Sequence, residues 1–378
     1  MQKHLLSFLK NHSRRPYRLF QIEPTLACNL DCIMCPWTEM RSLTGPMLWK
    51  TFERIIPYLP LAEGVDFTGG GEPLVHPRLP EMLCEAKKAG CQIGFSTNGT
   101  RLTPRLSQQL LDLGLDWISF SVDAADQETY ERIRQGARFD QVIANIESLR
   151  DQKSKCGSKS PRMMMVIVLM GGESGDQYAT QNYYQLPAYL ELGHRLGVEQ
   201  VIAKNLDVIL KPGDDERRLF THPDSGEKRP AHMELAEILA RSEARARELG
   251  IGLRLYNLQP QESSICENDP LHNLFFNWEG QVSPCITLSY AETRLFAGEQ
   301  VHAPCQVFGD IRSQTLDEIW NSPGYVAFRA AFEKRRQAER NAHITAMTQA
   351  MQGEMPETVF RLPPAPGSCR TCYYLYGI

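Results

Sequence analysis

The feature that most constrains the fold is an alternation of short apolar segments with amphipathic segments over about the first 210 residues. The apolar segments are typical of strands, because they are short and end at glycine, proline or polar residues. Six strands are expected, at residues 18–23, 65–68, 92–96, 117–122, 163–169 and 200–203. Because segments of helical period separate them, we expect a parallel sheet that is covered by helices.

Helices are expected between these strands and after them. They are predicted at residues 47–58, 78–89, 104–113, 127–134, 138–150 and 184–196, and then at 232–249, 315–321 and 324–351. Gly90, Gly114 and Gly197 stand where three of these helices should end. A strand at 253–256 and a hairpin at 274–283 are expected in the second half, so the chain changes character after the sixth strand.

Polar motifs follow four of the predicted strands. A loop with three cysteines follows the first strand, and Gly69-Gly-Gly-Glu72-Pro73 follows the second. Ser96-Thr-Asn-Gly99 and Ser121-Val-Asp123 follow the third and the fourth. Parallel sheets place ligand sites in the loops at the carboxyl ends of their strands. The four loops are therefore expected to converge on one catalytic face.

Composition narrows the class of protein. A net charge of −4, with 42% hydrophobic and 23% charged residues, is typical of a globular protein and gives no reason to expect a nucleic-acid partner. No apolar run approaches the ~18 residues that span a bilayer, and the polar N-terminus lacks the apolar core of a secretion signal. We therefore expect a cytoplasmic protein without membrane contact. Eleven cysteines are many for that compartment, where clustered cysteines more often bind metal than form disulfides.

The first cysteine group is Cys28, Cys32 and Cys35, at the spacing C-x3-C-x2-C. A structural zinc site takes four protein ligands, and its cysteines usually come as two separated pairs. A [4Fe-4S] cluster that is held by three thiolates keeps one iron without a protein ligand, and that iron can bind a substrate or cosubstrate. The triplet favours such a cluster. Zinc with a distant fourth ligand and three ordinary loop cysteines are the alternatives.

The same triplet, with Met34 before the third cysteine, resembles the signature of the radical S-adenosylmethionine (radical SAM) enzymes. The resemblance covers about the first 210 residues and implies an α/β fold, a partial (β/α)6 TIM-like barrel. It also implies that the open iron binds S-adenosylmethionine and that one electron from the cluster generates a 5′-deoxyadenosyl radical. That radical would abstract a hydrogen atom from a substrate C–H bond, while the protein positions and shields the reacting groups.

Residues in the other loops match cofactor-binding positions of this family. They are Gly70, Gly71 and Glu72 toward the methionine amino group, Asn98 in the cosubstrate pocket, Ser121 and Asp123 toward the ribose and methionine, and Arg134 toward the methionine carboxylate. Glycines allow close backbone approach, and a carboxylate suits an ammonium group. Taken singly, these residues would be turn glycines, helix caps or a surface charge. Their order at successive strand ends is what supports the resemblance.

The second cysteine group lies in the last third of the chain. Cys266, Gly280 and Cys285, at C-x13-G-x4-C, resemble the opening of the SPASM and twitch auxiliary-cluster domains, and Cys369-x2-Cys372 would complete a four-sulfur site. The glycine would permit the turn between the first two ligands. Because the chain has no further cysteine after Cys372, unlike a full SPASM domain, we expect one auxiliary [4Fe-4S] cluster rather than two.

These resemblances predict a division of the chain. We expect an N-terminal extension at 1–17, a radical SAM partial barrel at 18–210, a bridging segment at 211–260 and a SPASM- or twitch-like domain at 261–378. Cys305 is a candidate for one of three roles: a hydrogen-atom donor near the substrate, an auxiliary-cluster ligand or a structural cysteine. The segment 177–184, with Asn205 and Asp207, follows the fifth and sixth strands and is a candidate for the substrate pocket.

The resemblance leaves the reaction open between two kinds of substrate. One hypothesis is dehydrogenation, epimerisation or rearrangement of a small molecule such as a sugar, cyclitol or cofactor precursor. The alternative is a maturase of a peptide or protein, including a maturase of a tungsten- or molybdenum-cofactor oxidoreductase. An epimerase would need a thiol that donates a hydrogen atom, whereas a dehydrogenase would need a base and an electron acceptor. Either enzyme would take its electron from a donor such as flavodoxin or ferredoxin.

Overall fold

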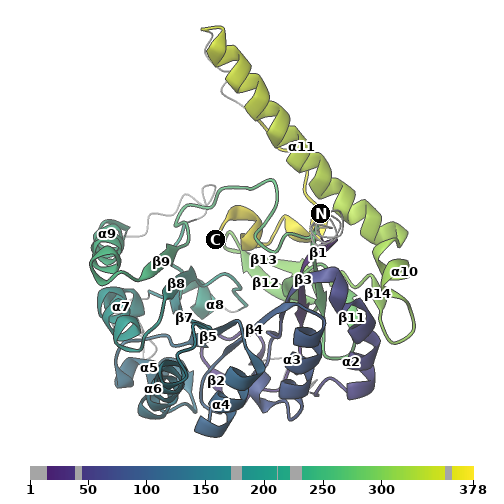
Figure 1. The fold of residues 1–378 in the computed structure, drawn as a ribbon. Helices are drawn as coiled ribbons and strands as arrows, with labels where there is room; N and C mark the ends of the chain where they lie inside the picture. Colours follow the sequence, from purple (N-terminus) through teal and green to yellow (C-terminus); the bar gives the residue numbers. More distant parts are fainter. Residues whose placement is uncertain (1–14, 39–44, 172–180, 211, 222–231, 354–359) are drawn as a thin grey trace, which may run out of the picture.

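The computed structural model describes residues 15–38, 45–171, 181–210, 212–221, 232–353 and 360–378 (Figure 1). The strands of its main sheet are β1 Tyr17–Ile22, β3 Ala62–Asp66, β4 Gln92–Thr97, β5 Trp117–Ser121, β7 Arg162–Leu169, β8 Gln200–Asn205, β9 Gly252–Leu255, β10 Asn273–Phe276, β11 Gln281–Ser283 and β14 Gly309–Asp310. Two small pairs lie outside that sheet: β2 Asp31–Cys32 with β6 Arg134–Gln135, and β12 Glu292–Phe296 with β13 Glu299–Ala303.

Ten α-helices lie between and after these strands in the described residues. They are α2 Trp49–Ile55, α3 Leu79–Lys88, α4 Pro104–Leu113, α5 Gln127–Ile133, α6 Phe139–Lys155, α7 Leu186–Arg195, α8 Pro212–Arg217, α9 His232–Leu249, α10 Leu316–Trp320 and α11 Pro323–Met351. Short 3₁₀ helices lie at Ile56–Leu61, Pro73–Val75, Asn182–Gln185, Ile286–Leu288, Gly367–Cys369 and Tyr373–Tyr376. Across these described segments, no helix is both long and apolar enough to cross a membrane.

In the described residues the ten strands of the main sheet run in the order β14-β11-β10-β1-β3-β4-β5-β7-β8-β9. Every neighbouring pair from β10 through β1 to β9 is parallel, whereas β10–β11 and β11–β14 are antiparallel. In Figure 1 the helices α2 to α7 and α9 form an outer arc around the strands. This is the helix-covered parallel sheet that the alternating pattern predicted, and all six expected strands are present.

Local signals explain where several elements begin and end. The Thr103 side chain accepts a hydrogen bond from the Leu106 amide at the start of α4, and Gly114 ends that helix with φ of 75°. The helix expected at 47–58 stops earlier, because Pro57 and Pro60 lack amide hydrogens and the chain continues as a 3₁₀ helix. The short β12–β13 hairpin was not expected from the sequence.

The sheet continues past the boundaries expected at residues 210 and 260. β9 pairs with β8, so the strand of the expected bridging segment extends the sheet of the barrel. β10 pairs with β1, so the hairpin of the C-terminal unit is hydrogen-bonded to the opposite edge. The division into domains stays a prediction, and residues 1–14 of its N-terminal extension lie outside the described residues.

The helix α11 extends from the body of the molecule in Figure 1. Its base is fixed by Arg335, which is fully buried and donates hydrogen bonds to the carbonyl oxygens of Ser263 at 2.7 Å and Ser264 at 3.2 Å. Phe328 and Phe332 pack into the core beside it. The first turns of this helix are therefore part of the C-terminal unit that carries the second cysteine group.

Candidate functional site

The three cysteines of the first group lie together in the loop that follows β1. They are half-buried and line one cavity of about 270 Å³. Burial raises the pKa of the Cys32 thiol to about 12, and the nearby Arg134 charge opposes part of that rise. The Arg134 Nη1 atom lies 3.7 Å from Cys32 Sγ, and the Asn98 Nδ2 atom lies 3.9 Å from Cys28 Sγ. Donors that face sulfur atoms suit a loop whose thiolates hold an iron–sulfur cluster.

The glycine loop after β3 packs directly on the cysteine loop. A Cβ atom at Gly71 would lie 2.4 Å from the carbonyl oxygen of Thr25 and 2.5 Å from that of Ala27. A Cβ atom at Gly70 would lie 2.6 Å from Leu26 Cδ1. Both glycines also line the cavity. They are therefore required by the contact between the two loops, in addition to the close approach to a cofactor that we expected.

Glu72 joins the loops after β3 and β4. Its Oε1 atom accepts hydrogen bonds from Thr97 Oγ1 at 2.6 Å and from the Leu74 amide at 3.0 Å. Its Oε2 atom accepts one from the Asn98 amide at 2.7 Å. Burial raises the pKa of Glu72, and these hydrogen bonds oppose the rise. Glu72 also lines the cavity. Its expected contact with the ammonium group of the cofactor stays a prediction, in addition to the hydrogen bonds by which it holds the two loops together.

Asn98 and Ser121 both line the same cavity, from the ends of β4 and β5. The Asn98 side chain donates to Asn29 Oδ1 at 3.1 Å and accepts from the Thr100 hydroxyl at 2.7 Å. Its orientation is therefore fixed by the loop itself. Ser121 is half-buried at the cavity wall, where its hydroxyl can contact a ligand.

Asp123 and Arg134 form a buried ion pair at the edge of the cavity. Asp123 is fully buried, and its Oδ2 atom accepts from Arg134 Nε at 2.6 Å. Its Oδ1 atom accepts from the Val168 amide at 2.7 Å. Arg134 lines the cavity, whereas Asp123 is not among the lining residues. Both oxygens of Asp123 accept hydrogen bonds from protein donors, and its expected contact with the cofactor stays a prediction.

Glu23, which the sequence analysis missed, connects three segments behind the cysteine loop. It follows β1 directly and is fully buried. Its Oε1 atom accepts from the Gly70 amide at 2.7 Å, and its Oε2 atom accepts from the Trp278 amide at 3.2 Å and from the Tyr290 hydroxyl. Its place at a strand end on the functional face was the one available signal. Glu23 therefore ties the glycine loop to the C-terminal unit.

Glu23 predicts a dependence of stability on pH. Burial raises its pKa from 4.5 to about 7, so the fold favours the neutral carboxyl group. This contribution is present below about pH 4.5 and is lost as the pH rises through about 7. We expect the free energy of unfolding, from anaerobic denaturant titrations, to fall over that range by up to ~1.4 kcal/mol per pH unit from this group. Glu23→Gln should remove this part of the slope, whereas Glu243→Gln on the exposed face of α9 should not. Equal slopes in the wild type and Glu23→Gln would contradict the prediction.

The second cysteine group also comes together in the fold. Cys369 and Cys372 are buried, and Cys266 and Cys285 are half-buried. Burial raises the pKa of all four thiols, that of Cys285 to about 12, and the thiols also act on one another electrostatically. Buried thiols are hard to ionise unless a metal offsets the cost. The donor set therefore fits an iron–sulfur cluster with four sulfur ligands.

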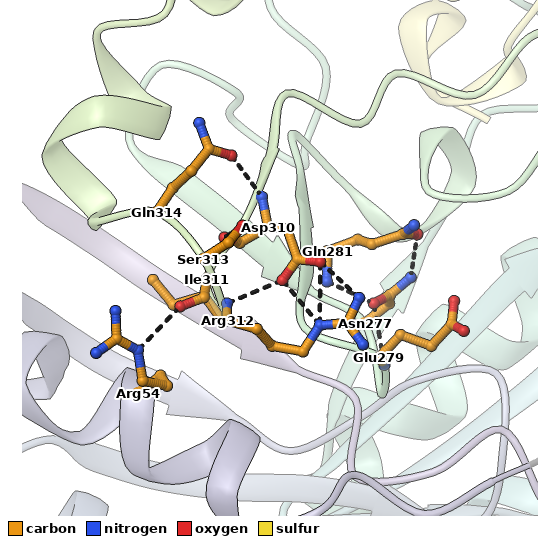
Figure 2. Close-up of polar contacts among 9 residues, drawn as sticks. All are labelled: Arg54, Asn277, Glu279, Gln281, Asp310, Ile311, Arg312, Ser313 and Gln314. Atoms are coloured by element: carbon orange, nitrogen blue, oxygen red, sulfur yellow. Dashed lines mark hydrogen bonds and ion pairs between the residues drawn. The ribbon is translucent and has the colours of Figure 1, made fainter.

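Hydrogen bonds fix the turn between β10 and β11, which precedes Cys285 in the sequence (Figure 2). The Asn277 Oδ1 atom accepts from the Gln281 amide at 2.8 Å, and Gly280 adopts φ of +94°, which favours glycine. The Gly280 carbonyl accepts from the Ile311 amide at 2.9 Å, and the Ile311 carbonyl accepts from Arg54 Nε of α2 at 3.3 Å. The hairpin β10–β11 is thereby fixed against the barrel.

Neither cysteine group is arranged as a site for a single metal ion in the part of the chain that the structure describes. No three described His, Cys, Asp or Glu side chains lie close enough together to hold a single metal ion. Zinc ligands must all stand about 2.3 Å or less from one ion. An iron–sulfur core is larger and holds its thiolates farther apart, so it suits both groups better than the zinc alternative does.

A second cavity, of about 400 Å³, lies between the two cysteine groups. It adjoins the first cavity, and the residues that line both are Pro36, Trp37, Thr68, Asp207 and Val208. Cys285 lines it on the side of the second group. A molecule in this space would thus lie between the two candidate cluster sites.

Polar side chains from three segments face this second cavity. Lys204 Nζ lies 2.9 Å from the Tyr374 hydroxyl and 3.0 Å from Asp207 Oδ2. Asp66, at the end of β3, accepts a hydrogen bond from Thr68 Oγ1 at 2.5 Å. Burial raises the pKa of Asp66 to about 7, and the hydrogen bonds from Thr68 offset the rise only in part. The cavity therefore offers a cation, hydroxyl groups and a carboxyl group that can exchange a proton near neutral pH.

Two family profiles match the chain over these regions. The radical SAM superfamily profile matches residues 22–180, and the SPASM iron–sulfur cluster-binding domain profile matches residues 266–343. The chain is a radical SAM enzyme with a SPASM-type domain. The resemblance that its cysteine spacing suggested is thereby confirmed, as is the fold class.

Known proteins resemble this radical SAM enzyme over most of its length. The tungsten-containing aldehyde ferredoxin oxidoreductase cofactor-modifying protein of Pyrococcus furiosus is 28% identical over 315 residues, which are 82% of each chain. The structure of anSMEcpe with bound AdoMet has a TM-score of 0.60 at 14% identity and covers 95% of both chains. That of Streptococcus suis SuiB bound to its precursor peptide SuiA has a TM-score of 0.56 at 13% identity, and covers 99% of this chain and 74% of SuiB. The two structures show the common fold.

Membership in the family decides the cofactors of this radical SAM enzyme. Its radical SAM domain binds a [4Fe-4S] cluster and S-adenosylmethionine, and its SPASM domain implies auxiliary iron–sulfur binding. The first cavity has the donor set that these groups require, with three thiols and a guanidinium group on its walls. The second cysteine group has the four thiols that a further cluster requires.

Cys305 is not among the residues that line the two cavities of the radical SAM enzyme. It is exposed in the loop between β13 and β14, and it lines neither cavity. A hydrogen-atom donor must reach the substrate radical, and a cluster ligand must reach the other thiols. The roles expected of Cys305 therefore stay predictions.

The segment 177–184 is only partly described, because 177–180 lie outside the described residues. Tyr183 and Tyr184 stack at 4.2 Å, and the Tyr184 hydroxyl donates to Glu234 of α9 at 2.7 Å. Asn205 is buried and donates to the Asn257 carbonyl at 2.8 Å. These residues support the scaffold, and of the expected substrate-pocket candidates among the described residues only Asp207 lines the two cavities.

Proposed function

We propose that this radical SAM enzyme oxidises a small polar molecule of the cofactor-precursor type, bound in the cavity between the two cysteine groups. The observation that carries the proposal is the position of that cavity. It is lined by the residue pair Pro36 and Trp37 beside the first group and by Cys285 of the second. A substrate there would lie within reach of both a radical source and an electron acceptor.

The proposal gives each expected site residue a role. Cys28, Cys32 and Cys35 would hold the first cluster with one iron open to S-adenosylmethionine, and Cys266, Cys285, Cys369 and Cys372 would hold the auxiliary cluster. Gly70, Gly71, Glu72, Asn98, Ser121 and Arg134 would surround S-adenosylmethionine, because they line the first cavity. Asp123 would act as a positioning residue that orients Arg134. The electron for the first cluster would come from a donor such as flavodoxin or ferredoxin.

When bound, the cluster and S-adenosylmethionine supply a 5′-deoxyadenosyl radical that removes one hydrogen atom from the substrate. A carbon radical next to a hydroxyl or amino group must still lose a proton and an electron to become a carbonyl or imine. Asp66 would take that proton, because its carboxyl group lines the cavity and has a pKa of about 7. The electron would leave to the auxiliary cluster beside Cys285. The substrate thus loses two hydrogens and is oxidised by two electrons.

The chemistry of the cavity walls favours dehydrogenation over epimerisation. An epimerase needs a thiol that returns a hydrogen atom to the carbon radical. Among the described residues that line the two cavities, every thiol belongs to one of the two cysteine groups: Cys28, Cys32, Cys35 and Cys285. Thiols that hold iron are not available as donors, so the geometry supports a dehydrogenase.

The size of the cavity favours a small molecule over the peptide of the alternative hypothesis. Ligand pockets of about 300–1,000 Å³ hold small molecules, and this cavity has about 400 Å³. The Pyrococcus furiosus relative, which matches this chain over 82% of its length, is named for the modification of the cofactor of a tungsten-containing oxidoreductase, and that name also fits the maturase alternative. A peptide substrate would have to place one side chain in the same space.

Asp66→Asn tests the proposed function. The amide keeps the size of the side chain but cannot accept a proton, so formation of the oxidised product should fall by about 10²–10⁴-fold. Release of 5′-deoxyadenosine should continue, because Asp66 does not line the first cavity. Both products are measured by mass spectrometry with a panel of polyols, amines, pterins and short peptides.

Asp112→Asn, on the exposed face of α4, is the matched control and should leave both products unchanged. The rate of product formation in the wild type should rise with pH through about 7, because only the ionised Asp66 carboxylate accepts the proton. Wild-type product yield in Asp66→Asn would overturn the role of Asp66. Turnover of peptides alone in the panel would replace the small-molecule proposal by the maturase alternative.

A further inference from the structure

Arg294 carries a buried guanidinium group whose hydrogen-bonding capacity is mostly unused. The side chain is 4% exposed, and its Nε and Nη2 atoms have no hydrogen-bond partner among the residues that the structure describes. Its Nη1 atom lies 3.4 Å from Glu292 Oε1, a long and imperfect ion pair. Burying charged donors without acceptors costs free energy. No described protein group therefore accepts a hydrogen bond from Arg294 Nε or Nη2.

The fold places Arg294 beside the second cysteine group. It lies on β12 of the β12–β13 hairpin, which packs on the segment that directly follows Cys372 (Figure 1). The Ala297 amide donates to the Tyr373 hydroxyl at 2.9 Å, and the rings of Phe296 and Tyr373 lie 4.8 Å apart. This anchor holds the hairpin against the C-terminal segment.

The charge of Arg294 determines which charge state of the neighbouring sulfur atoms it stabilises. Its guanidinium group is positively charged, so it stabilises negative charge on sulfur atoms beside it. Cys266 and Cys369 belong to the same group of thiols. The guanidinium group therefore favours negative charge on the sulfur atoms of this group, which is the charge that a bound cluster carries.

We propose that Arg294 donates its unused N–H groups to the sulfur atoms of the auxiliary cluster and sets its reduction potential. The proposal rests on the auxiliary cluster of the proposed function, but not on the identity of the substrate. Reduction adds negative charge to a cluster, so a cation and hydrogen-bond donors beside it stabilise the reduced form and raise the potential. Arg294 would thereby make the cluster a better acceptor for the electron that leaves the substrate. It is a positioning residue, because it acts through the cluster and not on the substrate.

Arg294→Met tests this in the reconstituted holoenzyme. Methionine keeps much of the apolar stem but removes the charge and the donors. At a fixed applied potential, the ratio of reduced to oxidised auxiliary cluster should fall at least tenfold, which is about 59 mV for a one-electron couple. The measurement is a redox titration followed by electron paramagnetic resonance, with S-adenosylmethionine present to separate the signals of the two clusters.

Two further variants make the result interpretable. Arg294→Lys keeps the charge but not the planar fork of donors, so its shift should have the same sign and be smaller. Arg245→Met removes one exposed arginine of α9 and should leave the ratio unchanged, which excludes an effect of net charge alone. The lysine variant also keeps the test valid if Arg294→Met impairs folding.

The outcomes separate this proposal from its competitors. An unchanged ratio with an unchanged iron content in both variants would overturn it. An unchanged ratio with a higher KM for substrate would assign Arg294 to the substrate instead. Loss of the auxiliary iron in both variants would show a purely structural role and would also overturn it. A wild-type protein with only about four irons would instead remove the auxiliary cluster, and with it the proposed function.

Discussion

Replacement of Cys28, Cys32 and Cys35 by alanine is expected to abolish 5′-deoxyadenosine release and to lower the iron content from about eight to about four per chain. The three thiols line the first cavity, and no other described cysteine lines it. Without them S-adenosylmethionine has no iron to bind and no source of an electron. The second group, at Cys285 and its three partners, is formed by other segments and should keep its cluster. Iron and sulfide assays after anaerobic reconstitution, with chromatography of the nucleoside product, measure both effects.

Cys156→Ala is the matched control for this variant. Cys156 is exposed at the end of α6, away from both cavities, so its loss should change neither the iron content nor the product. Retention of about eight irons in the triple variant would show that the first loop is not a cluster site. A triple variant that still releases 5′-deoxyadenosine would contradict the proposed roles of these residues directly.

Asp123→Ala is expected to lower the free energy of unfolding by about 3–5 kcal/mol, which is typical when one partner of a buried ion pair is removed. The substitution leaves the buried Arg134 guanidinium without its carboxylate and the Val168 amide without an acceptor. Arg134 also lines the first cavity, so its altered position should weaken the binding of S-adenosylmethionine. Denaturant titration of the anaerobic protein and equilibrium dialysis measure the two effects.

A nearby carboxylate provides the control for Asp123. Glu128 of α5 pairs with Arg132 on the surface, where its side chain is 83% exposed. Glu128→Ala should change the free energy of unfolding little, because exposed ion pairs contribute little. Equal losses in Asp123→Ala and Glu128→Ala would show that the buried pair has no special importance. Unchanged affinity for S-adenosylmethionine in a destabilised Asp123→Ala protein would limit Asp123 to a structural role.

The main elements of this fold could be predicted because buried parallel strands leave a strong signal. Met163 to Leu169 is nearly all apolar, and it forms β7 with alternate residues fully buried. The loops that follow the strands could also be located, because the carboxyl ends of parallel strands share one edge of the sheet. The first cavity is indeed lined from the loops after β1, β3 and β4 and from the carboxyl end of β5.

What the sequence did not reveal depends on contacts between distant residues. Glu23 reads as a polar residue before a proline, but its partners Trp278 and Tyr290 lie more than 250 residues away. Arg294 lies in a stretch rich in polar residues, so its burial could not be inferred from local composition. Asp123 was expected to face the ligand because it follows a strand end. The sequence gives no sign that Arg134 and the Val168 amide donate hydrogen bonds to its carboxylate. In each case the decisive information was the partner of a buried charge.

The parallel pairing of β1 with β10 has a consequence for how such an enzyme can be changed. Leu19 lies opposite Asn273 and Ile22 opposite Phe276, so the strand that leads into the first cysteine loop is hydrogen-bonded to the one that precedes the turn before Cys285. The distance between the two candidate cluster sites would then be fixed by the backbone hydrogen bonds between β1 and β10 and not by a flexible linker. A chimera that takes its C-terminal part from a relative must reproduce this alignment, since a slip by one residue would turn alternate side chains of β10 to the opposite face.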